Sequence, residues 1–170
     1  MQNWLSWSFW VHSAPGALHF VLALACLALG AYVLFSPKGN TRHRLLGSTW
    51  LILMITVNTS ALTMYGVSGR PNLFHGFAVL SLATIIPGYI SIRRYAQSGE
   101  LKHLAAHSIW MRWGYFGLAA AGVWQLASRA LLLAAGPGYF WTGIYVLIAL
   151  TIAASMMLNR WMQRQVVEVA

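Results

Sequence analysis

The residues of this chain whose type and position favour chemistry are its histidines. The six are His12, His19, His43, His75, His103 and His107. His19 and His75 lie inside apolar runs, where a polar ring is costly to bury. At 1.5 Å per helical residue, both fall in the outer leaflet within about 2–3 Å of one depth. His43 and His107 pair in the same way near the inner ends of two other runs.

This layout is the one that two stacked b-type haems require. Low-spin haem iron takes one imidazole from each face of the ring, and facing helices of a bundle supply such ligands. We therefore expect haem b, as one or two groups, with His19 and His75 as one pair of iron ligands and His43 and His107 as the other. The leading hypothesis is an electron-transfer protein that exchanges electrons with a quinol and with a membrane or periplasmic redox partner.

Charged residues are few and almost all basic. The chain has eleven Lys and Arg, two Glu and no Asp among its 170 residues. This excludes a Ser-His-Asp triad, a paired-carboxylate hydrolase and an oxygen-ligand Ca²⁺ or Mg²⁺ site. It also leaves Arg129, deep in an apolar run, without an acidic partner. We expect Arg129 to pair with an anionic haem propionate at the outer site. Candidates for the same role at the inner site are Arg42, Arg44 and Arg112.

Each of these assignments has a plainer alternative. His43 stands between two arginines and needs no ligand if it contacts lipid headgroups. His103 and His107 are four residues apart on one helical face, so with His43 they form either a metal site or an interfacial group. His12 precedes the first run and suits the membrane interface. Arg129 is long enough to snorkel to the outer interface.

Composition indicates which elements position these residues. Apolar residues make up 59% of the chain and charged residues 8%, whereas soluble domains have about 25% charged residues. Five apolar runs are each near the roughly 20 residues that a helix needs to cross a bilayer. Their approximate bounds are 14–35, 45–65, 72–92, 105–135 and 139–159. Turn-forming segments separate them, the last being Gly136-Pro137-Gly138. We expect one all-α transmembrane domain over residues 1–170, a bundle of five spans.

Basic residues set the expected orientation. They fill the loops after the first and third runs and follow the fifth, so the positive-inside rule places the N-terminus outside and the C-terminus in the cytoplasm. Residues 1–12 carry Trp4, Trp7 and Trp10, which predict an interfacial aromatic segment. Without a basic N-terminal region, a cleavable signal peptide is not expected. The expected location is the inner membrane of a bacterium.

Small and polar residues inside the runs predict helix contacts. Gly117 and Ala121 form a small-xxx-small pair, which lets a neighbouring backbone approach closely. The Pro87-Gly88 pair predicts a kink in the third run. Asn58 belongs to a polar stripe in the second run that predicts interhelical hydrogen bonds.

The stretch from His43 to Arg129 resembles a bacterial family of small predicted membrane proteins of unknown function. The similarity rests on HRLLG from His43, GFAVLSLATIIPGYISIRR from Gly76 and HSIWMRWGYFGLAAAGVWQLASR from His107. Recurring positions of that family match His43, Gly47, His107, Trp110, Met111 and Arg129. The resemblance implies a helical membrane bundle and no particular activity. In architecture alone, the histidine layout is also similar to that of transmembrane dihaem b-type cytochromes.

Two other classes of function stay open beside electron transfer. Small size and short loops suit a non-catalytic accessory subunit of a larger membrane complex, or a homo-oligomer. A small transporter or metal carrier is the third class, although the missing carboxylates and the lack of an inverted repeat weaken it. Nucleic acid is not an expected partner despite the net charge of +9, because the basic residues lie at the ends of apolar runs, next to the lipid bilayer.

Overall fold

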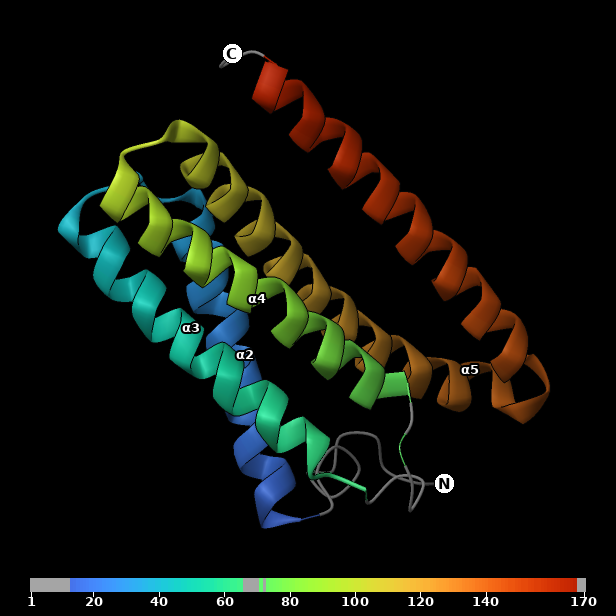
Figure 1. Cartoon of the computed structure of the whole chain (residues 1–170). Helices are drawn as coiled ribbons and strands as arrows, with labels where there is room; N and C mark the ends of the chain where they lie inside the picture. Colours follow the sequence, from blue (N-terminus) through green and yellow to red (C-terminus); the bar gives the residue numbers. More distant parts are fainter. Residues whose placement is uncertain (1–12, 66–70, 72, 168–170) are drawn as a thin grey trace. The chain divides into compact units, whose positions relative to one another are not determined.

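The computed structural model describes residues 13–65, 71 and 73–167, and every regular element among them is a helix. The helices are α2 (Ala14–Phe35), α3 (Thr41–Leu62), α4 (Leu73–Ser98) and α5 (Leu101–Val167), coloured in chain order in Figure 1. The all-α membrane fold that the composition predicted is therefore confirmed. The expected aromatic segment 1–12, with His12, lies outside the described residues.

Capping residues explain where the first two helices begin. The Ser13 side chain accepts a hydrogen bond from the backbone nitrogen of Gly16 at 3.2 Å, which satisfies a free N–H group at the start of α2. Asn40 does the same for α3, since its Oδ1 accepts from the backbone nitrogen of His43 at 2.7 Å. This cap starts α3 at Thr41, four residues before the expected start of the second run, so His43 belongs to the first helical turn.

Several described segments can cross a bilayer. Those long and apolar enough are Ala14–Phe35, Thr41–Leu62, Phe74–Ser98 and Thr142–Trp161. The expected span 105–135 is helical but is not among these four, and the side chains of its last residues lie outside those described. Large apolar side chains along the helices are exposed, for example Ile52 at 65% and Leu80 at 63%. Water would oppose so much exposed apolar surface, whereas lipid chains accommodate it.

The helix α5 folds back on itself. Its 67 residues are helical throughout, yet Nε1 of Trp124 donates a hydrogen bond of 2.9 Å to Oγ1 of Thr151. In a straight helix, 27 residues would separate these groups by about 40 Å. Figure 1 shows the ribbon of α5 reversing direction. We call residues 101–130 the first arm and 142–167 the second arm.

The predicted loop at Gly136-Pro137-Gly138 is therefore corrected. The sequence analysis placed a non-helical break there, whereas the backbone stays helical through these residues and the chain nevertheless turns. Proline removes one helical hydrogen bond and glycine resists bending least, which explains why a reversal falls here. The two expected spans are the two arms of one helix.

The chain divides into two compact units, Met1–Ile85 and Ile86–Ala170, and α4 runs from one into the other. Each unit is described by itself. In the first unit, α2 and α3 pack side by side (Figure 1). Nε1 of Trp50 on α3 donates to the Cys26 carbonyl oxygen on α2 at 3.1 Å, and both residues are buried. This bond ties the two helices together inside the apolar core.

Asn58 links α3 to α4 within the first unit. Its Nδ2 donates to the carbonyl oxygen of Met54, one turn earlier in α3, at 2.7 Å, and to Oγ of Ser81 on α4 at 3.3 Å. Both Asn58 and Ser81 are buried. Since an unsatisfied amide is costly in an apolar interior, these partners explain why an asparagine is tolerated here. The expected interhelical hydrogen bonding of the polar stripe is confirmed at Asn58.

Candidate cofactor site

His19 projects from the second turn of α2 and contacts the end of α3. Its Nδ1 lies 2.8 Å from Oγ of Ser60. The hydroxyl of Ser60 donates to the carbonyl oxygen of Val57 at 2.8 Å. A serine has one hydroxyl proton, so Oγ accepts from His19 and the proton of neutral His19 is on Nδ1. This leaves the lone pair on Nε2, the atom that then suits a metal ligand.

His75 lies in the first turn of α4 and is only 8% exposed. The ring of Tyr65 stacks on it, with ring centroids 5.0 Å apart and an interplanar angle of 29°. Tyr65 follows the last turn of α3, a few residues after Ser60. His19 and His75 therefore both contact the C-terminal end of α3 or the chain directly after it. The first unit brings these two histidines to one end of one helix.

His107 is held by backbone in the second unit. Its Nδ1 lies 2.9 Å from the carbonyl oxygen of Gly88 on α4. A carbonyl oxygen only accepts, so neutral His107 also carries its proton on Nδ1 and its lone pair on Nε2. His19 and His107 thus share one arrangement, in which Nδ1 contacts an acceptor on a neighbouring helix and Nε2 carries the lone pair.

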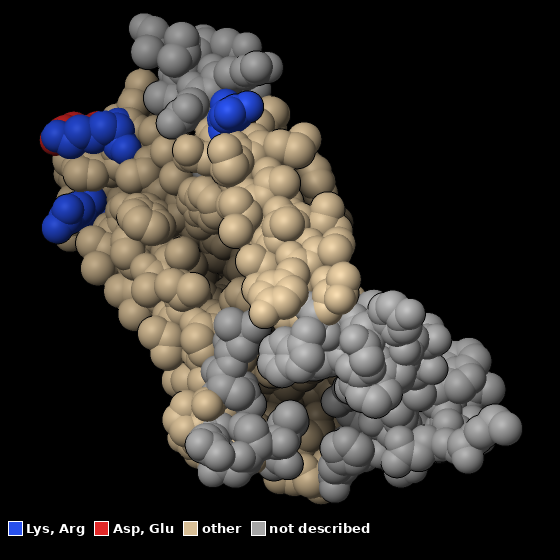
Figure 2. All heavy atoms as spheres, turned by 90° about the vertical axis from the view of Figure 1, so that its right-hand side faces the viewer, with Lys and Arg blue, Asp and Glu red and all other residues tan. Residues whose placement is uncertain are grey.

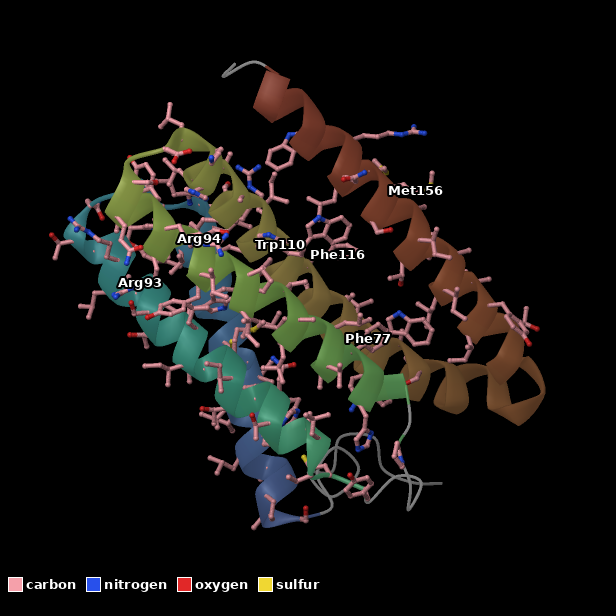
Figure 3. The ribbon with its side chains drawn as sticks, in the orientation of Figure 1. Phe77, Arg93, Arg94, Trp110, Phe116 and Met156 are labelled. Atoms are coloured by element: carbon pink, nitrogen blue, oxygen red, sulfur yellow. The ribbon has the colours of Figure 1, made fainter. Side chains whose placement is uncertain are left out.

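Gly88 makes this contact possible because it has no side chain. A Cβ at Gly88 would overlap Cε of Met111 and would lie 3.1 Å from Cβ of Trp110. Both contacting residues belong to the first arm of α5, where Figure 3 labels Trp110. The close approach of α4 and α5 therefore depends on glycine at this position.

The predicted close packing at Gly117 is not found. A Cβ there would meet no heavy atom within 4 Å among the described residues. Sequence spacing alone favoured Gly117 because small residues recur around it, but the helix contact in this unit falls at Gly88. For the Pro87-Gly88 pair the sequence predicted a kink and not a contact with α5. The residue that could have indicated this contact is His107, because an imidazole in an apolar run needs a hydrogen-bond partner.

The predicted inner pair is divided between the two units. His43 belongs to the first unit and His107 to the second, and each has its own surroundings. His43 is half-buried at the start of α3. Beside it, the guanidinium of Arg42 lies 5.3 Å from the centroid of the Tyr32 ring, a cation–π contact. Arg44 is exposed.

Two of the arginines expected at haem propionates, Arg112 and Arg129, belong to α5. Arg112 is half-buried on the first arm of α5, and its guanidinium lies 4.7 Å from the centroid of the Trp161 ring on the second arm. Arg129 lies on the backbone of α5, but its side chain is outside the described residues. The expected pairing of Arg129 stays a prediction.

The alternative of a metal held by protein alone finds no support in the described part of the chain. No group of three or more His, Cys, Asp or Glu side chains gathers there in a way that could hold a metal ion. Haem has a different requirement, because the porphyrin supplies four ligands and the protein supplies only the axial ones.

Comparisons with known proteins give a family and no function. No curated protein and no solved structure matches the chain in these searches. One family model, described as "Predicted membrane protein (DUF2306)", matches residues 16–162. This match includes α2, α3, α4 and both arms of α5 almost entirely, together with His19, His43, His75 and His107. The chain belongs to this family of predicted membrane proteins.

Proposed function

We propose that the protein is a haem b-binding electron-transfer protein of the bacterial inner membrane. The observation that carries the proposal is the shared state of His19 and His107. In each, a partner on a neighbouring helix accepts a hydrogen bond from Nδ1, so that Nε2 holds the lone pair. Histidines that ligate metals almost always donate their other ring N–H to such an acceptor.

The surroundings of these histidines favour haem over a hydrated metal ion. Both lie in helices without a single acidic residue, and the described residues offer no cluster of three ligands. An apolar helical environment with pairs of imidazoles suits the porphyrin, which is flat, largely apolar and already supplies four nitrogen ligands. His75, buried beside Tyr65 at the same end of α3 as His19, is the proposed second ligand of the outer haem.

The proposed reaction is oxidation of a membrane quinol. A quinol that becomes a quinone releases two electrons and two protons. Haem held by His19, His75 and His107 would supply one-electron redox chemistry, so that the two electrons could pass singly to a membrane or periplasmic acceptor. The protons pass to water at the membrane surface. The protein's own part is to hold the ligand nitrogens in position and to exclude water from them.

Absorption spectroscopy tests this proposal directly. Protein purified in detergent from haem-replete cells should show a Soret band and a sharp α band on dithionite reduction, with haem b in a pyridine haemochrome assay. His19→Ala, His75→Ala and His107→Ala should each lower the haem-to-protein ratio. His103→Ala is the matched control, because His103 lies in the first turn of α5, outside the proposed ligand set. Folded wild-type protein without a Soret band would overturn the proposal.

A further inference from the structure

Arg112 and Trp161 join the two arms of α5 at one level of the membrane. The guanidinium of Arg112 on the first arm lies 4.7 Å from the ring centroid of Trp161 on the second. Trp161 is the last residue of the candidate span Thr142–Trp161. The pair therefore lies where that span meets the membrane surface, which is the side rich in basic residues.

Stacking on Trp161 by itself engages none of the N–H donors of Arg112. The ring of Trp161 meets the flat face of the guanidinium, whereas its five N–H donors point outward in the plane of the group. Arg112 is half-buried, and a charge in such a place needs an anionic partner. Among the described residues the only carboxylate side chain is that of Glu100, which pairs with Lys102.

Among the described residues, the surroundings of the pair add positive charge. Arg160 precedes Trp161 and is exposed, and Trp161 itself is 48% exposed. On the face that Figure 2 shows, basic side chains gather toward one end of the described surface. The described residues therefore supply no free anion for Arg112, whereas the headgroup layer at this level offers lipid phosphates.

We propose that Arg112, Trp161 and Arg160 bind the phosphate of an anionic membrane phospholipid between the two arms of α5. The guanidinium edge binds the phosphate oxygens, the exposed ring of Trp161 lies at the headgroup level, and Arg160 favours a lipid with net negative charge. The lipid then links the arms as a third component. This site is independent of the haem proposal, because it requires neither His107 nor a bound cofactor.

Native mass spectrometry on the purified protein tests the site. Short-chain phosphatidylglycerol should bind, whereas phosphatidylcholine, which has a phosphate but no net charge, should bind more weakly. Arg112→Gln should weaken phosphatidylglycerol binding about tenfold, the effect of losing one charge-assisted contact. Arg94→Gln, which removes an equal charge from the exposed end of α4 (Figure 3), should leave the binding nearly unchanged.

Three other results would each contradict a specific part of the lipid-site proposal. Equal binding by wild type and Arg112→Gln would overturn the site. Competition by millimolar inorganic phosphate at the same residues would assign it to free phosphate instead of lipid. Loss of haem absorbance in Arg112→Gln, with lipid binding intact, would return Arg112 to the cofactor. If Arg112→Gln does not fold, Arg112→Lys keeps the charge but loses the planar donors, and it should still bind lipid less tightly than wild type.

Discussion

Nδ1 of His107 lies 2.9 Å from the carbonyl oxygen of Gly88, one helix away. The bond joins Gly88, the described glycine of α4 at which a Cβ would meet the first arm of α5, to a histidine on that arm. It fixes the tautomer of the imidazole, and at the same time it sets how closely the two helices approach. Position 88 is therefore where packing and the proposed chemistry of the second unit meet.

Replacing Gly88 tests this packing. Gly88→Ala should be less stable than Gly117→Ala by about 1–3 kcal/mol, the usual cost of overpacking, because both gain helix propensity but the new Cβ at position 88 meets Met111 and Trp110. Thermal or denaturant unfolding in detergent measures the loss. Gly117→Ala is the control, since its Cβ meets no described atom within 4 Å. It should be neutral, or stabilising by up to about 1 kcal/mol through helix propensity. A control as damaging as Gly88→Ala would contradict this account.

The polar contact between α3 and α4 can be measured as a coupling. Asn58→Ala should destabilise the first unit, because it removes the hydrogen bonds to Met54 and Ser81. In a double-mutant cycle with Ser81→Ala, we expect a coupling of about 0.6 kcal/mol, the average for interhelical hydrogen bonds in a membrane protein. A coupling near zero would show that the 3.3 Å contact with Ser81 contributes nothing.

The Trp124–Thr151 hydrogen bond joins the two arms of α5 and involves a buried tryptophan. Trp124→Phe keeps an aromatic ring but removes the N–H donor, and Thr151→Val removes the acceptor at nearly constant volume. Each should cost about 0.5–1.5 kcal/mol, and the double variant should cost less than their sum. Strictly additive losses would mean that the two side chains do not interact across the arms.

Replacing Ser60 tests whether the hydrogen-bond partner of His19 affects haem binding separately from folding. If His19 binds haem as proposed, Ser60→Ala should leave the protein folded but lower the affinity for haem about 10–100-fold, the range for lost outer-shell partners of a metal-ligating histidine. It should also shift the midpoint potential, because the Nδ1 partner sets the basicity of the ligand. Thr59→Ala, at an exposed neighbouring position, is the control. Unchanged potential and occupancy in Ser60→Ala would separate Ser60 from the cofactor.

The Glu100–Lys102 pair, where α4 ends and α5 begins, predicts how pH affects stability. The side chain of Lys102 hydrogen-bonds the Glu100 carboxylate and so lowers the pKa of Glu100 below its usual value. A lowered pKa contributes stability above the unfolded pKa, and the contribution disappears as pH falls through the folded pKa. Because both side chains are exposed, water screens the pair. Glu100→Gln should therefore leave the melting temperature at pH 7 almost unchanged, and a clear fall would show a stronger role.

Much of the fold follows from local sequence. The run 14–35 coincides with α2, because Ser13 and Pro15 mark its start and the apolar sequence has the length of a span. The helical character of all described spans follows from the same rule, since every backbone group in lipid needs an internal partner. The presence of histidines in such segments was equally visible, because a buried imidazole stands out in an apolar run.

Tertiary structure decided which partners these residues have. Nothing in the sequence around His19 identifies Ser60, 41 positions away, as the group that holds Nδ1. Small-residue spacing favoured Gly117, yet α4 and α5 meet at Gly88, because contact depends on which faces two helices present to each other. The same reason explains the turn within α5, where a proline–glycine segment bends the chain but helix–helix contacts such as Trp124–Thr151 hold the arms together. Local sequence sets the helices, and the packing of distant residues sets the site.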